Sequence, residues 1–457
     1  MSKSALNRRQ FIRTGSAGLV SVGLLTTTRQ LGAQNAKSKN DRHIFGLIGA
    51  GGQGSHDSRR AMPFADIAAV ADVDQTHRDR AKRDLSKGKA DTYEDYRELL
   101  DRKDIEAVII GTPDHWHTKV CLDALRSGKD VYCEKPLTLT IDEGKLLCET
   151  VKTTGRVFQV GTQQRSEPPH LFLKAVAMCR DGRLGTIRKV QAAIGGAPAG
   201  GPFQTASPPN HLNWNQWLGQ APMAEYIPQR CHGNFRWWYE YSGGKMTDWG
   251  AHHVDICHWV LDAANTGPVH FEGEAKHPVP LENGYATKAN FYNTATQFLI
   301  KCKFDNGVEM VIRHDTDNGV LIEGDKGRIF VNRGRLTGAP VDQLKEEPLP
   351  EGLLQKVYKG KQPGHHMRNF VECVRDRSEP ISDVNSHHRA LTSCHLANIA
   401  IRLGRAIKWD PKSEQIVGDD EASRWMSREH RKGFEVVCTI GFSHRSEPTA
   451  ICVFLPY

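Results

Sequence analysis

Three residues of this chain suit proton chemistry at a hydroxyl or carbonyl group. Lys135 directly follows the apolar run 130–133, so a strand there would direct its ammonium into a crevice, where it can stabilise an alkoxide. Asp248 and His252 lie four residues apart, which is helical spacing, and Asp255 continues the same face. A histidine beside a carboxylate keeps a defined tautomer and acts as a general base near neutral pH. We therefore predict that Lys135, Asp248 and His252 are catalytic.

The same histidine-rich segment could bind a metal instead. His252 and His258, with the neighbouring aspartates, are ligand types that zinc accepts. Spacing fixes no compatible ligand set elsewhere, and none of the eleven cysteines forms a CxxC pair. We therefore predict no metal site, and we expect the cysteines, several of which stand in apolar runs, to be buried thiols.

A glycine-rich segment, residues 49–54, has the spacing of a dinucleotide-binding turn. It reads Gly-Ala-Gly-Gly-Gln-Gly and follows the apolar run 44–48. Gly49 permits the tight turn, Gly51 lets the backbone approach a pyrophosphate, and Gly54 allows the next helix to pack on the strand. The N–H groups and the dipole at that helix N-terminus favour a phosphate. The residues expected to contact the cofactor here are Gly49, Gly51, Gly52, Gln53 and Gly54.

Asp72 bears on the choice between the two nicotinamide dinucleotides. It ends the next apolar run, about 20 residues beyond the turn, where a carboxylate accepts hydrogen bonds from ribose hydroxyls. The same charge repels a 2′-phosphate, whereas Arg78 and Arg80 would attract one. We therefore expect NAD, which this position favours over NADP.

Thr112 begins a further segment expected at the same edge of the sheet. The segment reads Thr-Pro-Asp-His-Trp-His and follows the apolar run 107–110, and ligands bind along the carboxyl edge of such strands. A surface turn capped by Asp114 is the alternative, and it leaves His117 unexplained. For Lys135 the corresponding alternative is a solvated lysine after a strand.

Strands and helices that must position these residues alternate along the first part of the chain. Short apolar strands separated by helices indicate a doubly wound parallel sheet of the Rossmann type. The predicted strands are 44–48, 67–71, 107–110, 130–133 and 157–161, and the predicted helices are 52–62, 76–85 and 118–127.

Beyond about Gln163 the pattern changes to strands joined by short turns, which predicts a largely antiparallel sheet with one open face. A loop is expected at 195–209, either a lid or an arm in an oligomer. The predicted strands are 297–303, 308–314, 320–323 and 328–331, with a turn at 305–307. The predicted helices are 169–180, 251–261, 367–375 and 390–407.

The composition fits a two-domain globular protein. Its 457 residues, 39% of them hydrophobic, exceed what one ordinary domain holds. The net charge of +8 does not indicate a nucleic-acid partner, because basic and acidic residues alternate, as in 78–84. No apolar stretch has the length of a stable membrane span.

The first residues have the pattern of an export signal. Residues 7–12 read Asn-Arg-Arg-Gln-Phe-Ile, and the short, mildly apolar stretch 15–28 follows. We predict a twin-arginine signal peptide over residues 1–34, against the alternative of a basic tail. This route carries folded proteins to the periplasm, which has no large NAD pool, so the cofactor should be bound tightly.

Together these motifs resemble the glucose-fructose oxidoreductase, inositol dehydrogenase and MocA (Gfo/Idh/MocA) family. The resemblance runs from about Ile44 to Asp410 and comprises the glycine turn, Asp72, and the segments around Thr112, Lys135 and Asp248 in order. It implies an α/β fold with an N-terminal Rossmann domain over 43–162. A C-terminal α/β domain over 163–410 should carry a largely antiparallel open sheet that often serves oligomerisation, as a dimer or tetramer. Residues 411–457 are expected to be a C-terminal tail, in which 436–457 do not resemble the family.

The resemblance also implies roles for individual residues. Lys135 would orient substrate and cofactor, and His252 would take the hydroxyl proton as hydride leaves carbon, with Asp248 assisting. The implied cofactor contacts beyond the turn are Asp72, Thr112, Pro113, His117, Glu134, Lys135 and Gln163. The implied substrate contacts are Lys135, Trp238, Tyr239, Asp248, His252 and His253. Trp238 and Tyr239 belong to the aromatic run 235–239, which is either a carbohydrate-facing surface or ordinary core.

The expected function is therefore an exported NAD-dependent oxidoreductase acting on a hydroxyl of a sugar, cyclitol or related polyol. An NAD-dependent glycosidase that oxidises, eliminates and restores its substrate is one alternative, with His117 and Tyr239 as candidate acids. A non-catalytic sugar- or cofactor-binding protein is the other, and the presence of Lys135, Asp248 and His252 argues against it.

Overall fold

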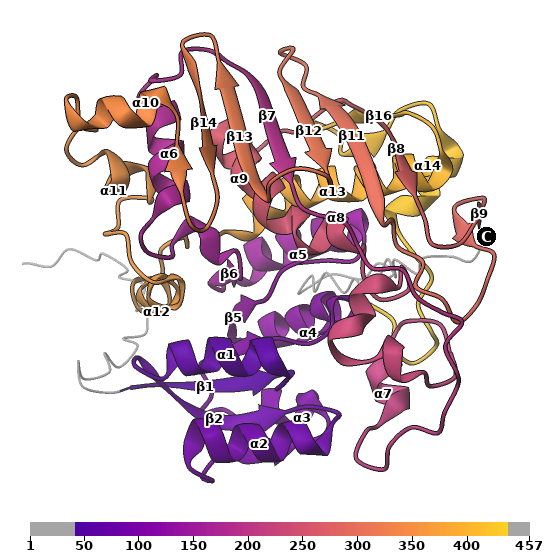
Figure 1. The fold of residues 1–457 in the computed structure, drawn as a ribbon. Coiled ribbons are helices and arrows are strands. Elements are labelled where there is room, and N and C mark those ends of the chain that lie inside the picture. The colour runs from indigo at the N-terminus through magenta and orange to yellow at the C-terminus, as the bar shows by residue number, and fades with distance from the viewer. Residues whose placement is uncertain (1–41, 437–457) are drawn as a thin grey trace, which may run out of the picture. The chain divides into compact units, whose positions relative to one another are not determined.

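A six-stranded parallel sheet forms the first half of the chain in the computed structural model, which describes residues 42–436 (Figure 1). The strand order is β3-β2-β1-β4-β5-β6, so the crossovers reverse between β1 and β4 and leave a crevice at the carboxyl edge. The strands are β1 (His43–Ile48), β2 (Ala65–Ala71), β3 (Asp91–Tyr93), β4 (Ala107–Ile110), β5 (Asp130–Cys133) and β6 (Phe158–Val160). The helices are α1 (Gly52–Ala61), α2 (Gln75–Ser86), α3 (Tyr96–Leu100), α4 (Asp114–Arg126) and α5 (Ile141–Thr154).

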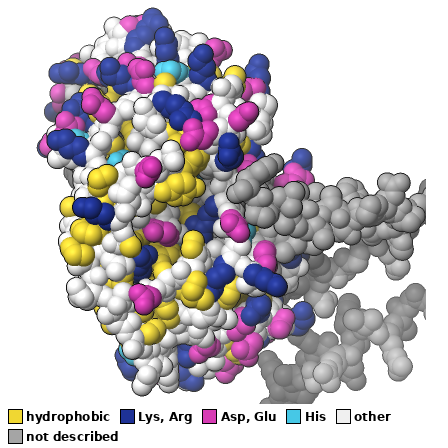
Figure 2. Space-filling model, turned by 90° about the vertical axis from the view of Figure 1, so that its right-hand side faces the viewer, with side chains coloured by type: hydrophobic (Ala, Val, Ile, Leu, Met, Phe, Trp, Pro, Cys, Tyr) yellow, Lys and Arg dark blue, Asp and Glu magenta, His cyan; other side chains and the backbone are white. Residues whose placement is uncertain are grey.

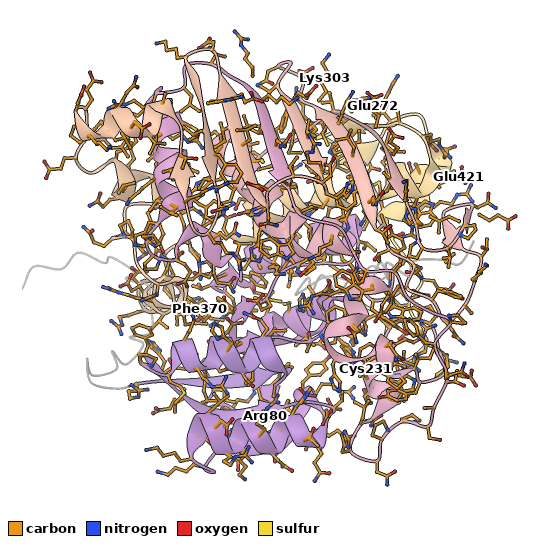
Figure 3. The ribbon with its side chains drawn as sticks, viewed as in Figure 1. Arg80, Cys231, Glu272, Lys303, Phe370 and Glu421 are labelled. Atoms are coloured by element: carbon orange, nitrogen blue, oxygen red, sulfur yellow. The ribbon has the colours of Figure 1, made fainter. Side chains whose placement is uncertain are left out.

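One face of this sheet is completed by a helix from much later in the chain. Phe370 of α12 (His366–Asp376), labelled in Figure 3, packs its ring 5.9 Å from that of Phe45 and 5.8 Å from that of Tyr132. Met367 and Val371 join the same buried cluster. The expected domain limits 43–162 therefore omit a helix that the parallel sheet needs to bury its second face.

A nine-stranded sheet forms the second half, in the order β15-β14-β13-β7-β12-β11-β8-β16-β17. Only β7 and β12 pair in parallel; the other neighbours are antiparallel. The strands are β7 (Ile187–Ala193), β8 (His270–Lys276), β11 (Gln297–Lys303), β12 (Glu309–Arg313), β13 (Gly319–Gly324), β14 (Gly327–Val331), β15 (Leu336–Thr337), β16 (Ile407–Asp410) and β17 (Gln415–Ile416), beside a separate pair of β9 (Leu281–Glu282) and β10 (Tyr285–Ala286).

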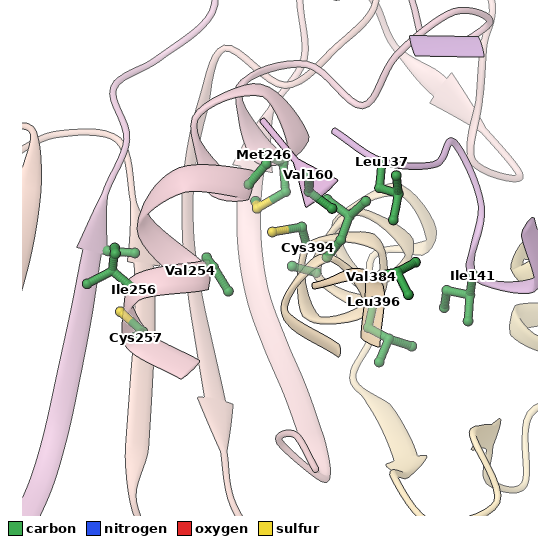
Figure 4. Close-up of a cluster of buried hydrophobic side chains, with 14 of the residues drawn as sticks. Leu137, Ile141, Val160, Met246, Val254, Ile256, Cys257, Val384, Cys394 and Leu396 are labelled. Carbon is green, nitrogen blue, oxygen red and sulfur yellow. The ribbon is translucent and has the colours of Figure 1, made fainter. Parts of the chain in front are cut away.

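Three helices cover the inner face of the nine-stranded sheet, namely α6 (Leu171–Arg180), α9 (Gly250–Val260) and α13 (Val384–Leu403). Helix α13 also packs on α5, so it lies between the two sheets (Figure 1). Figure 4 shows Val254 and Cys257 of α9 beside Cys394 of α13, within one buried cluster that also holds Ile141. On the opposite face, residues such as Lys303 and Glu272 extend away from the core (Figure 3). The remaining helices are α7 (Trp214–Leu218), α8 (Lys245–Asp248), α10 (Ala339–Asp342), α11 (Leu353–Val357) and α14 (Asp420–Ser423).

The predicted fold class is confirmed, with differences in single elements. The long helix predicted to reach residue 407 ends at Leu403, because Gly404 takes a left-handed conformation (φ 65°) and Ile407 starts β16. The helix predicted from 118 begins at Asp114, so that residue lies in the first turn and is not its cap. The central strand β7 and strand β8 were not predicted; β8 reads His-Phe-Glu-Gly-Glu-Ala-Lys, which gives little apolar signal.

Several sequence predictions concern the ends of the chain and its surface. The twin-arginine segment and residues 437–457 lie outside the described residues. The described part of the expected tail is packed on the protein, since β17 pairs with β16 and Arg431 donates to the carbonyl of Gly219 at 2.8 Å. Within residues 42–436 no helix combines the length and apolar character needed to cross a bilayer. On the face shown in Figure 2, basic and acidic side chains are interspersed.

Candidate active site

Two cavities meet at the carboxyl edge of the parallel sheet. The first, of about 420 Å³, follows the glycine turn and the strand ends that carry Asp72 and Thr112. The second, of about 480 Å³, lies toward the second half of the chain, where Trp249 and His252 line it. Four residues line both cavities: Gln53, Glu134, Lys135 and Arg236. Any ligand that extends from one cavity into the other must pass these four side chains.

The glycine turn has the backbone that a pyrophosphate requires. Gly49 has φ 84°, in the left-handed region that favours glycine. A Cβ on Gly54 would lie 2.1 Å from the carbonyl oxygen of Gly49, so only glycine lets α1 start this close to β1. Gly51 caps α1 without a side-chain hydrogen bond, which leaves the first N–H groups available to an anion. The turn therefore fits a dinucleotide.

Asp72 is held at the rim of the first cavity by the backbone. Its carboxylate accepts hydrogen bonds from the N–H of Ala50 at 2.6 Å and of Asp74 at 2.9 Å. Arg78 donates to the carbonyl of Asp72, and Arg80 to the carbonyl of Ala50 at 3.4 Å. The carboxylate is thus fixed on the cavity wall, where it can accept ribose hydroxyls, while both arginines already have carbonyl partners.

The segment that follows β4 joins three parts of the site. Thr112, Pro113 and His117 line the first cavity. The ring of His117 lies between the carbonyl oxygens of Pro136, 2.6 Å from Nδ1, and Thr112, 2.9 Å from Nε2. Burial lowers the pKa of His117. His117 therefore ties the loop after β4 to the loop that carries Lys135.

A covering segment from the second half closes over the first cavity beside Asp72. The N–H of Gln75 donates to the carbonyl of His211 at 2.8 Å, and the N–H of Asn213 donates to the carbonyl of Val73 at 3.0 Å. His115 and Trp116 both contact the carbonyl oxygen of Trp217, at 2.9 and 3.0 Å. The residues of this covering segment, defined as 211–217 with 232–236, that line the cavity are Gln216, Trp217, His232, Gly233, Phe235 and Arg236. The preceding loop, predicted at 195–209, packs on its own chain, for example through the N–H of residue 203 and the carbonyl of residue 290.

Lys135 and Asp248 form an ion pair at the wall shared by the two cavities. The Lys135 Nζ lies 2.6 Å from Asp248 Oδ1 and donates also to the Asp248 carbonyl at 3.1 Å. Arg236 Nε donates to the same carboxylate oxygen at 3.2 Å. Burial acts to raise the pKa of Asp248, but Lys135 and Arg236 outweigh it and hold the pKa at about 2. Asp248 is therefore a carboxylate that orients two cations.

His252 lines the second cavity from the first turn of α9. It is 4% exposed, and its Nδ1 has no hydrogen-bond partner among residues 42–436. Burial, the ammonium of Lys135 and the guanidinium of Arg333 all lower its pKa, to well below the ordinary histidine value. His252 is therefore a neutral imidazole at pH 7, able to accept a proton.

Asp255 does not share the face of Asp248 and His252. Helix α8 ends at Asp248 and α9 begins at Gly250, so regular helical spacing does not run through this segment. Asp255 is buried and accepts two hydrogen bonds from Arg165, both at 2.7 Å. Its role in this position is to hold α9 on the chain segment that follows β6.

The other residues that the sequence assigned to substrate lie away from both cavities. Trp238 is buried, and its indole N–H donates to the carbonyl of Gln229 at 2.8 Å. The Tyr239 hydroxyl lies 3.1 Å from His277, and His253 Nε2 lies 2.9 Å from Asn318. The aromatic run is thus divided: Phe235 and Arg236 line the first cavity, whereas Trp238 packs into a buried aromatic cluster. His258, the further metal candidate, contacts the Ser393 hydroxyl at 3.0 Å.

Glu134 carries a second buried carboxyl group beneath the shared wall. Gln163 Nε2 donates to its Oε1 at 2.5 Å, and Gln53 donates to the same oxygen at 3.4 Å. Gln53 also donates to both carboxyl oxygens of Asp57, at 3.1 and 3.2 Å. Burial raises the pKa of Glu134 and raises that of Asp57 well above its usual range. Burial therefore favours the protonated form of both carboxyl groups.

The sequence did not indicate several of the cavity residues. Arg236 and Trp249 stand inside segments that were singled out, so a search for charged or aromatic neighbours could have found them. Arg333, which lines the second cavity, and Asp57, which is buried behind Gln53, carry no such signal, because folding alone brings them to the site. The lining residues of the second cavity not yet described are His56, Arg60, Gln164, Glu167, Pro168, Pro169, Leu171 and Phe172.

Family models match both halves of the chain. The model described as "Oxidoreductase family, NAD-binding Rossmann fold" matches residues 44–162, and "Oxidoreductase family, C-terminal alpha/beta domain" matches residues 201–436. The scyllo-inositol 2-dehydrogenase (NAD(+)) of Bacillus subtilis is 26% identical over 348 residues, which are 73% of this chain and 87% of that protein. An alpha-N-acetylgalactosaminidase of Shewanella oneidensis is 33% identical over 174 residues, but these are only 33% of this chain and 38% of that protein.

Solved structures share the fold. The aldose-aldose oxidoreductase of Caulobacter crescentus has a TM-score of 0.56 at 17% identity, over 80% of this chain and all of that one. The WlbA dehydrogenase of Bordetella pertussis, solved with NADH and UDP-GlcNAcA, has a TM-score of 0.58 at 17% identity, over 81% and 99% of the two chains. With the Rossmann crevice and the matched family models, these findings show that the chain is an NAD-binding oxidoreductase and belongs to the Gfo/Idh/MocA family.

Proposed function

We propose that this oxidoreductase transfers hydride from a hydroxyl-bearing carbon of a sugar or cyclitol to a tightly held NAD. The observation that carries the proposal is the Lys135–Asp248 ion pair, 2.6 Å long, at the wall shared by the two cavities, with His252 lining the second. This arrangement supports a reaction in which a hydrogen-bond donor at the shared wall and a neutral proton acceptor in the second cavity act on one hydroxyl group.

The second cavity suits a hydroxylated ring. Trp249 and Phe172 offer flat apolar surfaces, and Gln163 and Gln164 offer hydrogen-bonding groups. The inositol dehydrogenase relative supports a cyclitol or a sugar of similar size as the substrate class.

The residues of this chain would divide the work as follows. Lys135, fixed by Asp248, donates a hydrogen bond to the reacting oxygen and stabilises the developing alkoxide. His252, which its lowered pKa keeps neutral, accepts the hydroxyl proton. Bound NAD supplies the hydride acceptor. The glycine turn would hold the pyrophosphate and Asp72 the ribose, while Thr112, Pro113, His117, Glu134 and Gln163 would shape the nicotinamide end.

Retention of the cofactor is the second part of the proposal. The covering segment is bonded to Val73 and Gln75, directly beside Asp72, so a bound adenosine would be enclosed. An enclosed cofactor agrees with the twin-arginine sequence at residues 7–12 and with work in a periplasm that lacks a nucleotide pool. Such an enzyme needs a second sugar or polyol to reoxidise its cofactor in place. The open face of the nine-stranded sheet would serve a homo-oligomer.

An NAD-dependent glycosidase is the second candidate, supported by the similarity to the alpha-N-acetylgalactosaminidase. Neither expected acid suits this reaction, because the His117 ring contacts two carbonyl oxygens and Tyr239 lies outside both cavities. Glu134, which lines both cavities and whose pKa burial raises, is the better acid. A glycosidase would exchange a substrate C–H with solvent deuterium without net oxidation; a dehydrogenase would not release an aglycone.

The first test is to denature freshly purified protein and identify the dinucleotide that it releases. We expect close to one NAD per chain. An empty protein that binds added NAD only weakly would contradict the retained cofactor.

A further inference from the structure

We propose that Arg333 forms a carboxylate-binding subsite in the second cavity, so that the substrate is an acidic sugar such as a uronic or aldonic acid. This inference rests on the proposed function, because it names the substrate class of that site. It starts from the charges that line the cavity.

The other cations of the second cavity already have carboxylate partners. Arg60 lies 2.7 Å from Glu167. Lys135 and Arg236 share the carboxylate of Asp248, at 2.6 and 3.2 Å. These side chains are therefore occupied in fixing the site, and an incoming anion would have to compete for them.

Arg333 differs from these cations. It lies in the turn between β14 and β15, and its guanidinium carbon is 4.8 Å from the centre of the Trp249 ring. Within residues 42–436 it makes no ion pair and no hydrogen bond that would use its five N–H donors. A planar guanidinium with free donors binds a carboxylate through two parallel hydrogen bonds. Arg333 therefore presents at the cavity wall a positive charge that is unpaired among the described residues.

Arg335, in the same turn, has the hydrogen-bond partner that Arg333 lacks in the described part of the chain. Arg335 Nη2 donates to Asp317 at 2.7 Å, and the guanidinium packs on Phe330. It does not line the cavity. The two arginines, two residues apart, therefore differ in having a partner and in facing the substrate, which makes Arg335 a matched control.

Trp249 links Arg333 to the reacting groups. The Trp249 ring contacts the Arg333 guanidinium, and its centre lies 6.0 Å from that of the His252 ring. The Arg333 charge also contributes to the lowered pKa of His252. A ring-sized substrate lying along Trp249 would therefore bring its acid group to Arg333 while its hydroxyl meets Lys135 and His252.

The experiment measures binding of matched neutral and acidic ligands to the NAD-loaded protein by calorimetry. The pairs are glucose with glucuronate, galactose with galacturonate, and gluconate against glucitol; glucose 6-phosphate tests a phosphate in place of a carboxylate. We expect the acidic member of at least one pair to bind about tenfold or more tightly, as a charge-assisted hydrogen bond provides. Arg333→Gln should abolish this ratio, Arg333→Lys should keep part of it, and Arg335→Gln should leave it unchanged.

The outcomes separate the subsite from the proposed function. Equal affinities within every pair, or a ratio that survives in Arg333→Gln, would overturn the subsite. Tighter, Arg333-dependent binding of the phosphate than of any carboxylate would overturn the carboxylate assignment. If glucuronate binds through Arg333 but never reduces the bound NAD, the hydride-transfer proposal fails and the subsite stands. Arg333→Gln should melt close to the temperature of the parent protein, because Arg333 is exposed and loses, of its contacts within residues 42–436, only that with the Trp249 ring.

Discussion

The two cavities of this protein are built in different ways. The cofactor cavity depends on the backbone of one contiguous turn, residues 49–54, and on a carboxylate held by backbone N–H groups. The substrate cavity is assembled from side chains on separate segments, including Gln163, Phe172, His252 and Arg333. The first can therefore be recognised in the sequence, whereas the second exists only once the two sheets are packed together.

The largest expected effect tests the shared wall between the cavities. Lys135→Ala should lower kcat by about 10³-fold, because the reacting oxygen loses its donor and Asp248 loses its closest cation. NAD should remain bound, since the glycine turn is untouched. Turnover kinetics and cofactor stoichiometry measure the two effects, with Lys145→Ala on α5 as the control lysine.

Survival of turnover in Lys135→Ala would remove this lysine from the reaction. Loss of NAD together with turnover would mean that Lys135 also holds the cofactor cavity in place. The two cavities would then not be built independently.

Two aspartates in the second half of the chain distinguish a catalytic role from a structural one. Asp255→Asn should lower the free energy of unfolding by about 3 kcal/mol, because it leaves the buried Arg165 without its counter-charge. Its kcat should stay near the parent value at temperatures where it is folded. Asp248→Asn should instead lower kcat by about 10²-fold with a smaller loss of stability. Denaturant unfolding and steady-state kinetics on both variants check this, and exchanged effects would contradict the placement of the two side chains.

A pair of glycines tests the cofactor half. Gly54→Ala would place a Cβ 2.1 Å from the Gly49 carbonyl oxygen, so α1 must shift and the affinity for NAD should fall about tenfold or more. Gly364→Ala, outside both cavities, would bring a Cβ no closer than 3.6 Å to another residue, and this variant should bind NAD like the parent protein. Titration of apo-protein with NAD measures both, and equal affinities would show that the turn does not carry the cofactor.

The smallest expected effect concerns pH: we expect the rate of alcohol oxidation not to change at about pH 6.5, where an ordinary histidine would titrate. His252 has a lowered pKa, so the neutral form persists as pH falls through the ordinary histidine value of about 6.5. The rate of alcohol oxidation, as kcat/KM, should therefore stay level from about pH 8 to about pH 6.5 and fall only below it. A half-maximal point near 6.5 that disappears in His252→Asn would mean that the imidazole is far more exposed in solution than in this structure.

The fold was largely predictable because its signals are local. The strands near Leu47, Ile109 and Val131 are short apolar runs, and each lies in the parallel sheet as predicted. β7 was missed because it is central yet only partly apolar, and it pairs in parallel with the distant β12. Helix α12 was predicted as a helix, but its place under the Rossmann sheet depends on contacts more than 200 residues apart in sequence, as between Gln159 and His366.

The candidate site was predictable where a residue follows a strand or a glycine turn. Lys135, Asp72 and Thr112 are in that class, and they line the cofactor cavity. Trp238 and Tyr239 could not be placed from the sequence, because an aromatic run has the same composition whether it forms a binding surface or part of the core. Asp57 and Arg333 belong to no sequence motif. Only the folded chain brings Asp57 to its hydrogen-bond partner and leaves the Arg333 guanidinium without one among the described residues.

Deuterium transfer tests hydride chemistry at the shared wall most directly. Freshly purified protein is mixed with scyllo-inositol, glucose and glucuronate, each carrying deuterium on its hydroxyl-bearing carbons, and is then denatured so that the released dinucleotide can be weighed by mass spectrometry. We expect reduced NAD that carries one deuterium after incubation with at least one of these compounds, and none from Lys135→Ala. Dinucleotide that stays oxidised and unlabelled with all three, in protein that binds them, would contradict hydride transfer between the two cavities.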